Sequence, residues 1–208
     1  MDEAMLTALI ADQRRDLAAT LGALRPDQWH APSLCEGWRV RDVVAHIVMP
    51  FRYSTGKFIL EMVRARGKFN VMAMRCARRD ADELSTGELV DALADNVNHA
   101  WKPPGGGLAG ALSHDVIHGL DITVALGLDQ PVPDQRIRAV LDSTKPRSIR
   151  YFGADLTGVQ LRADDLDWTY GSGEPLTGSA QDLLLVLCGR TLPPGHLTGE
   201  PRSRFSRQ

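Results

Sequence analysis

The sequence of 208 residues has little cysteine, few aromatic residues and no long apolar run. Its three cysteines, Cys35, Cys76 and Cys188, are odd in number and far apart, which predicts a reducing cytoplasm rather than a disulfide framework. No apolar stretch approaches the ~20 residues that cross a bilayer, and the acidic start of the chain does not resemble a secretory signal. We therefore expect a cytoplasmic protein without a membrane partner.

An excess of charge of either sign is also missing. The 24 basic and 26 acidic residues give a net charge of −2, which argues against a nucleic-acid partner, since such proteins carry a basic excess. The basic residues are nearly all arginine, a bias that is compatible with a GC-rich actinobacterial genome. Six of them lie between residues 64 and 79 with no acidic residue among them. This run predicts a solvated face or, alternatively, a surface that attracts an anionic substrate.

Apolar residues recur every three or four positions over much of the first 150 residues, which predicts amphipathic helices. Ser85 and Glu88 form a possible capping box at the start of one of them, and Pro50 should kink or divide another. The expected helices cover residues 3–24, 38–66, 86–101 and 108–126, and a further one begins at Pro133.

The pattern changes after about residue 153. Short runs near 159–161 and 166–170 predict strands, and Ser179 with Asp182 predicts the start of a final helix. We therefore expect a mainly α protein, with an up-down four-helix bundle over residues 1–152. A small α+β segment with a β-hairpin and a helix should follow over residues 153–208, with a flexible tail from 197 to 208.

Three histidines carry the chemical signal. His114 and His118 stand four residues apart in an apolar helix, which puts both rings on one face. A divalent metal would satisfy two imidazoles buried there, and His46, on an earlier apolar helix, is the natural third ligand. Asp42, four residues before His46, and Asp121, three after His118, are candidates to orient a ligand ring. Core histidines bonded to carbonyls or carboxylates are the alternative interpretation.

The other candidate groups give weaker signals. His30 and His196 are expected at the surface, and no chemistry is assigned to His99. Cys35 lacks a CxxC or Cys–His pairing and is interpreted as a small buried residue beside Trp38.

Two motifs resemble a known family. Residues 33–46, SLCEGWRVRDVVAH, are similar to the N-terminal signature of the mycothiol-dependent maleylpyruvate isomerase family, which belongs to the DinB-like metal-binding bundles. Residues 114–122, HDVIHGLDI, resemble that family's second signature. The stretch from Leu166 to Arg190 resembles the small C-terminal segment of its actinobacterial members. The resemblance therefore spans nearly the whole chain.

The resemblance implies a DinB-like bundle with one divalent metal on His46, His114 and His118, zinc by default and nickel as another possibility. It also implies mycothiol or a similar thiol as cosubstrate. The metal would lower the thiol pKa, and the thiolate would attack a small electrophile in a thiol transfer or a thiol-assisted isomerisation. The partners would be small molecules, and the protein would be a monomer or a homodimer.

Two other functions fit the same residues. His114-Asp115-x-x-His118 is similar to the helix of zinc hydrolases, with Asp115 as the general base and water as the nucleophile. The third possibility is a metal-binding bundle without catalytic activity. Turnover without added thiol would indicate the hydrolase, and a closed four-ligand site would indicate the non-catalytic protein.

Overall fold

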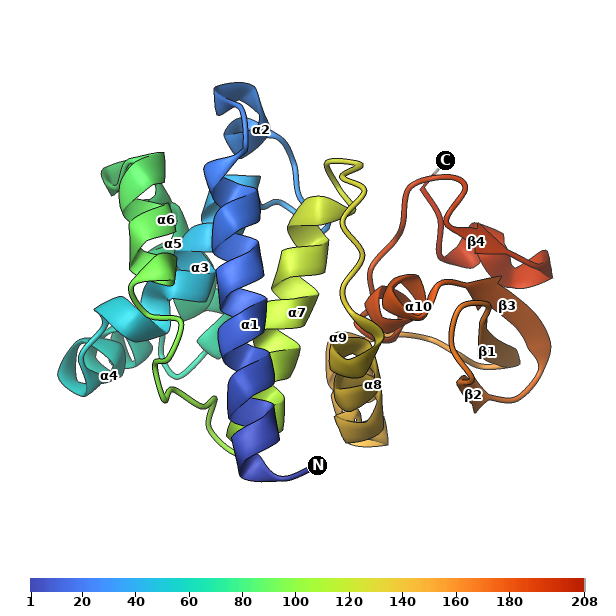
Figure 1. The fold of residues 1–208 in the computed structure, drawn as a ribbon. Helices are drawn as coiled ribbons and strands as arrows, with labels where there is room; N and C mark the ends of the chain where they lie inside the picture. The colour runs from blue at the N-terminus through green and yellow to red at the C-terminus, as the bar shows by residue number, and fades with distance from the viewer. Residues whose placement is uncertain (208) are drawn as a thin grey trace. The chain divides into compact units, whose positions relative to one another are not determined.

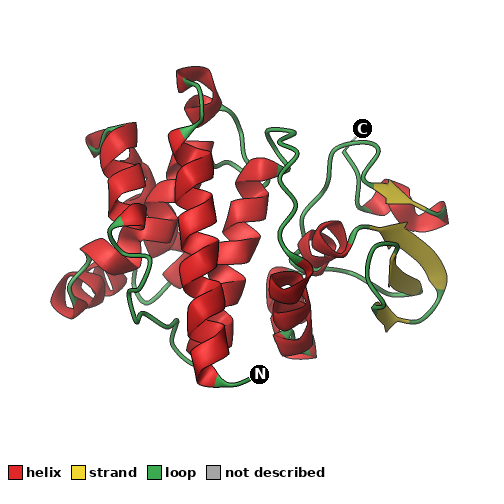
Figure 2. Cartoon of the chain, viewed as in Figure 1, coloured by secondary structure: helices red, strands yellow, loops and turns green. Residues whose placement is uncertain are grey.

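The computed structural model describes residues 1–207, which form mainly helices with a small sheet near the C-terminus (Figure 2). The chain divides into two compact units, one up to His118 and the other from Gly119 onward. The division falls within one long helix, so this helix contributes to both units. The predicted domain boundary after residue 152 stays a prediction.

The first unit is a helical bundle, as predicted (Figure 1). Within it, α3 packs against α5 and α6, and α1 packs against α6. Its helices are α1 (Glu3–Gly22), α2 (Pro26–His30), α3 (Val40–Arg52), α4 (Thr55–Arg64), α5 (Phe69–Glu83), α6 (Thr86–Ala94) and α7 (Gly107–Thr123).

Some helix boundaries differ from the sequence-based prediction. The segment 38–66 is divided into two helices, one of the two outcomes predicted from Pro50, but the break follows Arg52 and Pro50 itself lies inside α3. Ser54 begins the second helix, because its side chain accepts a hydrogen bond from the backbone N–H of Lys57. Helix α6 has the predicted capping box but ends at Ala94 rather than near residue 101. Helix α2 was not foreseen.

Helix α3 is the most deeply placed element of the bundle. Nearly every residue from Val40 to Met49 is buried, polar ones included. A helix that is covered on several sides needs apolar residues on several faces, and the run of valine, isoleucine and alanine in α3 supplies them. His46 therefore lies inside the bundle rather than at its surface.

The second unit contains a four-stranded sheet of order β2-β1-β3-β4. The predicted hairpin is β1 with β2, which pair antiparallel, and β3 adds to β1 in parallel. The elements are α8 (Asp134–Ser143), α9 (Pro146–Phe152), β1 (Val159–Ala163), β2 (Thr169–Gly171), β3 (Glu174–Gly178), α10 (Ala180–Leu187), β4 (Leu197–Thr198) and the 3-10 helix η1 (Glu200–Arg204).

The C-terminal tail is more structured than the sequence suggested. We predicted a flexible segment from residue 197, but β4 pairs with β3 and η1 follows it. The ring of Phe205 is buried, and Leu192 pairs with Ser206 in an isolated bridge. One aromatic side chain thus anchors a segment whose polar composition indicates fraying.

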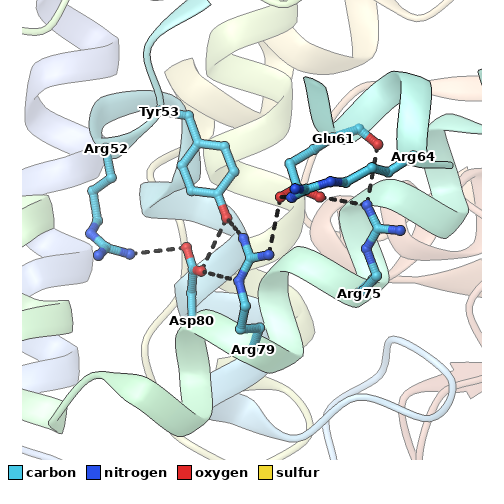
Figure 3. Close-up of polar contacts among 7 residues, drawn as sticks. All are labelled: Arg52, Tyr53, Glu61, Arg64, Arg75, Arg79 and Asp80. Atoms are coloured by element: carbon cyan, nitrogen blue, oxygen red, sulfur yellow. Dashed lines mark hydrogen bonds and ion pairs between the residues drawn. The ribbon is translucent and has the colours of Figure 1, made fainter. Parts of the chain in front are cut away.

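A buried carboxylate joins α4 to α5. Glu61 is only 3% exposed and accepts hydrogen bonds from Arg64, Arg75 and Arg79 (Figure 3). Burial alone would raise the pKa of Glu61, but the hydrogen bonds from Arg79 and Arg75 outweigh it and hold the pKa at about 2. The carboxylate is therefore ionised at any ordinary pH.

A second carboxylate extends this network to α3. Asp80 is buried and accepts hydrogen bonds from Arg52 at 2.9 Å and from the hydroxyl of Tyr53 at 3.0 Å. Arg79 donates to the same hydroxyl, so it joins the two carboxylates (Figure 3). Burial and the charge of Asp80 raise the pKa of Tyr53 well above its ordinary value.

Replacing Glu61 by glutamine tests this network. We expect Glu61→Gln to lower the free energy of unfolding by about 1–2 kcal/mol at pH 7, because the arginines that lose their partner are themselves partly exposed. Because folding depresses the Glu61 pKa from its ordinary 4.5 to about 2, this stabilisation is complete above 4.5 and fades as the pH falls toward 2. Urea unfolding at several pH values measures it. Glu83→Gln, at an exposed position, is the control, and a pH-independent difference would contradict the prediction.

Candidate metal centre

The structure brings together the three histidines that the sequence singled out. His46 lies on α3, and His114 and His118 lie one turn apart on α7. One ligand atom from each of the three lies within 4.8 Å of the others, and the ring centroids are 4.9–5.1 Å apart. Two helices far apart in sequence therefore present three imidazoles to one point.

The spacing of the ring nitrogens fits a shared metal ion. The Nε2 atoms of His46 and His114 are 3.3 Å apart. Two nitrogens that bind one tetrahedral zinc ion at ~2.05 Å are separated by about 3.3 Å. A neutral imidazole also has one nitrogen free of a proton, which is the atom that a metal needs. The residues present therefore fit a divalent metal.

A carboxylate behind His114 fixes the orientation of its ring. The Nδ1 atom of His114 lies 2.9 Å from Oδ1 of Asp115. An Nδ1–H that donates to this oxygen leaves the Nε2 lone pair directed at the site. The HDxxH pattern suggests Asp115 as a general base but does not predict this orienting contact.

An arginine holds Asp115 in turn. The Nε–H of Arg14, on α1, donates to Oδ2 of Asp115 at 2.7 Å, and both side chains are fully buried. Arg14 also donates to the carbonyl of His99 at 2.8 Å and stacks over the ring of Phe51 at 4.9 Å. The sequence contains a signal that Arg14 is buried. It lies between Ile10 and Leu17 on the face of its helix that carries the apolar residues.

A thiol lies beside His118. The Sγ atom of Cys35 is 3.8 Å from Nδ1 of His118, and its side chain is half-buried. The predicted proximity to Trp38 is present, since the carbonyl of Cys35 accepts a hydrogen bond from the Trp38 N–H at 3.0 Å. Cys35 therefore lies beside Trp38 as expected, but its side chain is only partly buried, and its proximity to His118 was not predicted.

Two tryptophans flank the histidines. The ring of Trp38 meets His46 edge-on with centroids 5.4 Å apart, and Trp101 meets His114 at 5.1 Å. Both tryptophans are half-buried, and the side chain of His114 keeps 15% of its surface exposed. The histidine cluster is therefore bordered by two aromatic rings and is not fully sealed from solvent.

The two aspartates predicted to orient ligands make other contacts. Asp42 is buried and accepts hydrogen bonds from the backbone N–H and the guanidinium of Arg39, at 2.8 and 2.7 Å. Asp121 is buried near the end of α7 and pairs with Arg190 at 2.7 Å. Their roles toward the histidine rings stay predictions.

The remaining histidines stand outside this cluster. His30 is exposed, as expected. His196 was expected at the surface, but Nδ1 of its ring lies 3.0 Å from Asp182 in the second unit. His99 meets the ring of Phe51, and no chemistry is assigned to it.

The chain is similar to one family profile and to two crystal structures. Residues 10–102 match a family profile described as the mycothiol maleylpyruvate isomerase N-terminal domain. Crystal structures of the mycothiol-dependent maleylpyruvate isomerase and of a histidine-to-alanine mutant of it each give a TM-score of 0.63, at 13% and 14% identity. Each alignment covers 100% of this chain and 95% of the other, which shows a shared fold. No curated protein gives a significant match.

Metal content tests the site directly. We expect protein purified without a histidine tag to carry about one equivalent of divalent metal, or to take it up from zinc or nickel solution. His118→Ala should lose nearly all of it, since two imidazoles bind far more weakly than three. His30→Ala, at an exposed histidine, should retain it. Elemental mass spectrometry gives the measurement, and a wild type that stays unloaded would overturn the assignment.

The orienting role of Asp115 gives a separate prediction. Asp115→Asn should weaken metal binding by about 10–100-fold, because the ring behind the ligand nitrogen loses a charged acceptor. It should also lower the free energy of unfolding by about 3 kcal/mol, because Arg14 stays buried without its counter-charge.

A buried carboxylate on a helix that bears none of the three histidines supplies the control. Asp80→Asn also breaks a pair with an arginine, Arg52, but should leave metal affinity nearly unchanged. Competitive chelator titration, at a temperature where circular dichroism shows all variants folded, measures the affinities. Equal losses in both variants would show that Asp115 acts through stability alone.

Proposed function

We propose that the chain is a divalent-metal-dependent enzyme that uses a low-molecular-weight thiol of the mycothiol type, and the match of residues 10–102 to the mycothiol maleylpyruvate isomerase N-terminal profile supports this. The reaction is a thiol transfer to a small electrophile or a thiol-assisted isomerisation. His46, His114 and His118 are the proposed metal ligands. The proposed cosubstrate is mycothiol or a close analogue, and the partners are small molecules.

The convergence of the three imidazoles is the observation that carries this proposal. Three neutral ligands leave the full double charge of a bound ion and one open coordination position. When bound there, zinc or nickel lowers the pKa of a thiol, so that the thiolate exists near neutral pH. The partial exposure of His114 leaves a path for the thiol and the electrophile.

The chain's own residues supply orientation and shielding. Asp115 holds the proton on Nδ1 of His114, so its Nε2 faces the site. The rings of Trp38 and Trp101 cover parts of His46 and His114 and would shield a bound thiolate from part of the solvent. In the proposed transfer, the thiolate sulfur forms a bond to an electrophilic carbon while the π bond of a Michael acceptor or the C–O bond of an epoxide breaks, and the released electron pair takes up the proton that the thiol lost. In the isomerisation, it adds to one carbon of a double bond, and its departure after rotation restores the double bond.

The reducing environment that such a thiol requires is part of the proposal. None of the three cysteines forms a disulfide within the described residues 1–207, which is consistent with the predicted cytoplasmic location. Burial raises the pKa of the Cys188 thiol to about 12, so that sulfur is protonated and unreactive. The oligomeric state, monomer or homodimer, does not enter the chemistry.

The hydrolase alternative has less support from the geometry. A general base must reach a water molecule at the site. Both oxygens of Asp115 are taken by His114 and Arg14, and its side chain is fully buried. No observation specifically favours the non-catalytic bundle, which remains an outcome of the test.

Thiol dependence decides among the three functions. We expect consumption of small Michael acceptors or epoxides only when metal and mycothiol are both present, and at least ~100-fold less with His114→Ala. Calorimetry of mycothiol binding to loaded protein, with S-methylated mycothiol as control, gives a readout that needs no substrate. Metal-dependent turnover without thiol would indicate a hydrolase instead. Absence of thiol binding would indicate a non-catalytic bundle.

A further inference from the structure

The helical hairpin of α4 and α5 combines exposed aliphatic side chains with a high density of positive charge. We propose that this hairpin, residues 54–79, docks on the anionic surface of a lipid bilayer. The proposal replaces the expectation of no membrane partner. It is independent of the proposed function, because it involves none of the histidines.

The outward face of α4 is apolar. Ile59, Leu60 and Val63 expose 56%, 49% and 69% of their surface. The inward face carries Glu61 and Ala65, which are buried. Side chains as exposed as Val63 project from a convex surface rather than line a groove. On α5, three more large apolar residues are exposed: Phe69, Val71 and Met74.

The same hairpin is strongly basic on its outside. Residues 54–79 contain seven basic residues and one acidic one, in a chain whose net charge is −2. The acidic residue is Glu61, which lies beneath the surface and is paired with three arginines (Figure 3). No carboxylate in this range is therefore exposed. The exposed basic residues are Lys57, Arg64, Arg66, Lys68, Arg75 and Arg78.

This combination favours a lipid surface over the other occupants. A second copy of the chain would bring two basic faces together, which is repulsive. Tyrosine and tryptophan, which are enriched at protein interfaces, do not occur in residues 54–79. Aliphatic side chains on one face with lysine and arginine beside them are typical of helices that lie in the headgroup region. No helix in the described part of the chain is long and apolar enough to cross a membrane, so the contact would be peripheral.

Vesicle flotation tests the proposal with the full-length protein. We expect binding to phosphatidylcholine vesicles that contain about 30% phosphatidylglycerol, little binding to pure phosphatidylcholine, and release at high salt. The triple variant Lys57→Gln, Arg66→Gln and Lys68→Gln should bind about 100-fold more weakly, since each basic residue contributes several-fold in affinity.

The apolar part has its own variant and a matched control. Ile59→Ser, Leu60→Ser and Val63→Ser together should weaken binding at least ~10-fold. Tyr151 and Phe152 on α9 are also exposed and stand beside Arg150, so Tyr151→Ser with Phe152→Ser should bind like the wild type. Thermal unfolding and metal content should be unchanged in every variant, because the altered side chains are exposed.

Several outcomes would overturn the proposal. One is absence of binding to anionic vesicles, and another is equal binding to neutral ones. Equal weakening by the α9 variant would show a non-specific effect. Light scattering that finds a wild-type dimer, dissociated by the α4 serine variant, would show that a second copy covers this face instead.

Discussion

The buried ion pair between Arg14 and Asp115 is the interaction on which the candidate metal centre depends. It joins α1 to α7, and the second oxygen of the same carboxylate fixes the ring of His114. A charge buried to this extent is tolerated only with its partner in place, so the pair cannot relax without a large loss of stability. The same ion pair therefore holds two helices of the bundle together and fixes the orientation of a proposed ligand ring.

Helix α7 carries a second buried carboxylate near its other end. Asp121 pairs with Arg190 within the second unit, while Asp115 pairs with Arg14 within the first. The helix that bears His114 and His118 is thus fixed by an arginine in each unit. Helix α3, buried along most of its length, holds His46 in a similarly rigid way. Such rigidity suits a site whose ligand atoms must keep metal-binding distances.

In the rest of the first unit, key carboxylates are buried and many of the basic side chains lie at the surface. The carboxylates of Glu61 and Asp80 are buried and paired with arginines, which tie together α3, α4 and α5. Because Glu61, the one acidic residue of the segment 54–79, is used internally, the outer surface of that segment is left basic. The arrangement that stabilises the hairpin therefore also gives it the charge on which the proposed docking rests.

The sequence by itself determined the helical class, the C-terminal hairpin and the three histidines, because periodicity and i, i+4 spacing are local properties. It also predicted that Pro50 would kink or divide the segment 38–66, and the segment is divided, although Ser54 rather than Pro50 caps the second helix. Only the tertiary structure decided that Asp115 backs His114, that Cys35 lies beside His118 and that Phe205 anchors the tail. His114 and Asp115 are adjacent in the sequence, but Cys35 and His118 are far apart in it, and Phe205 is buried within a polar segment. These contacts follow from packing, which no local pattern encodes.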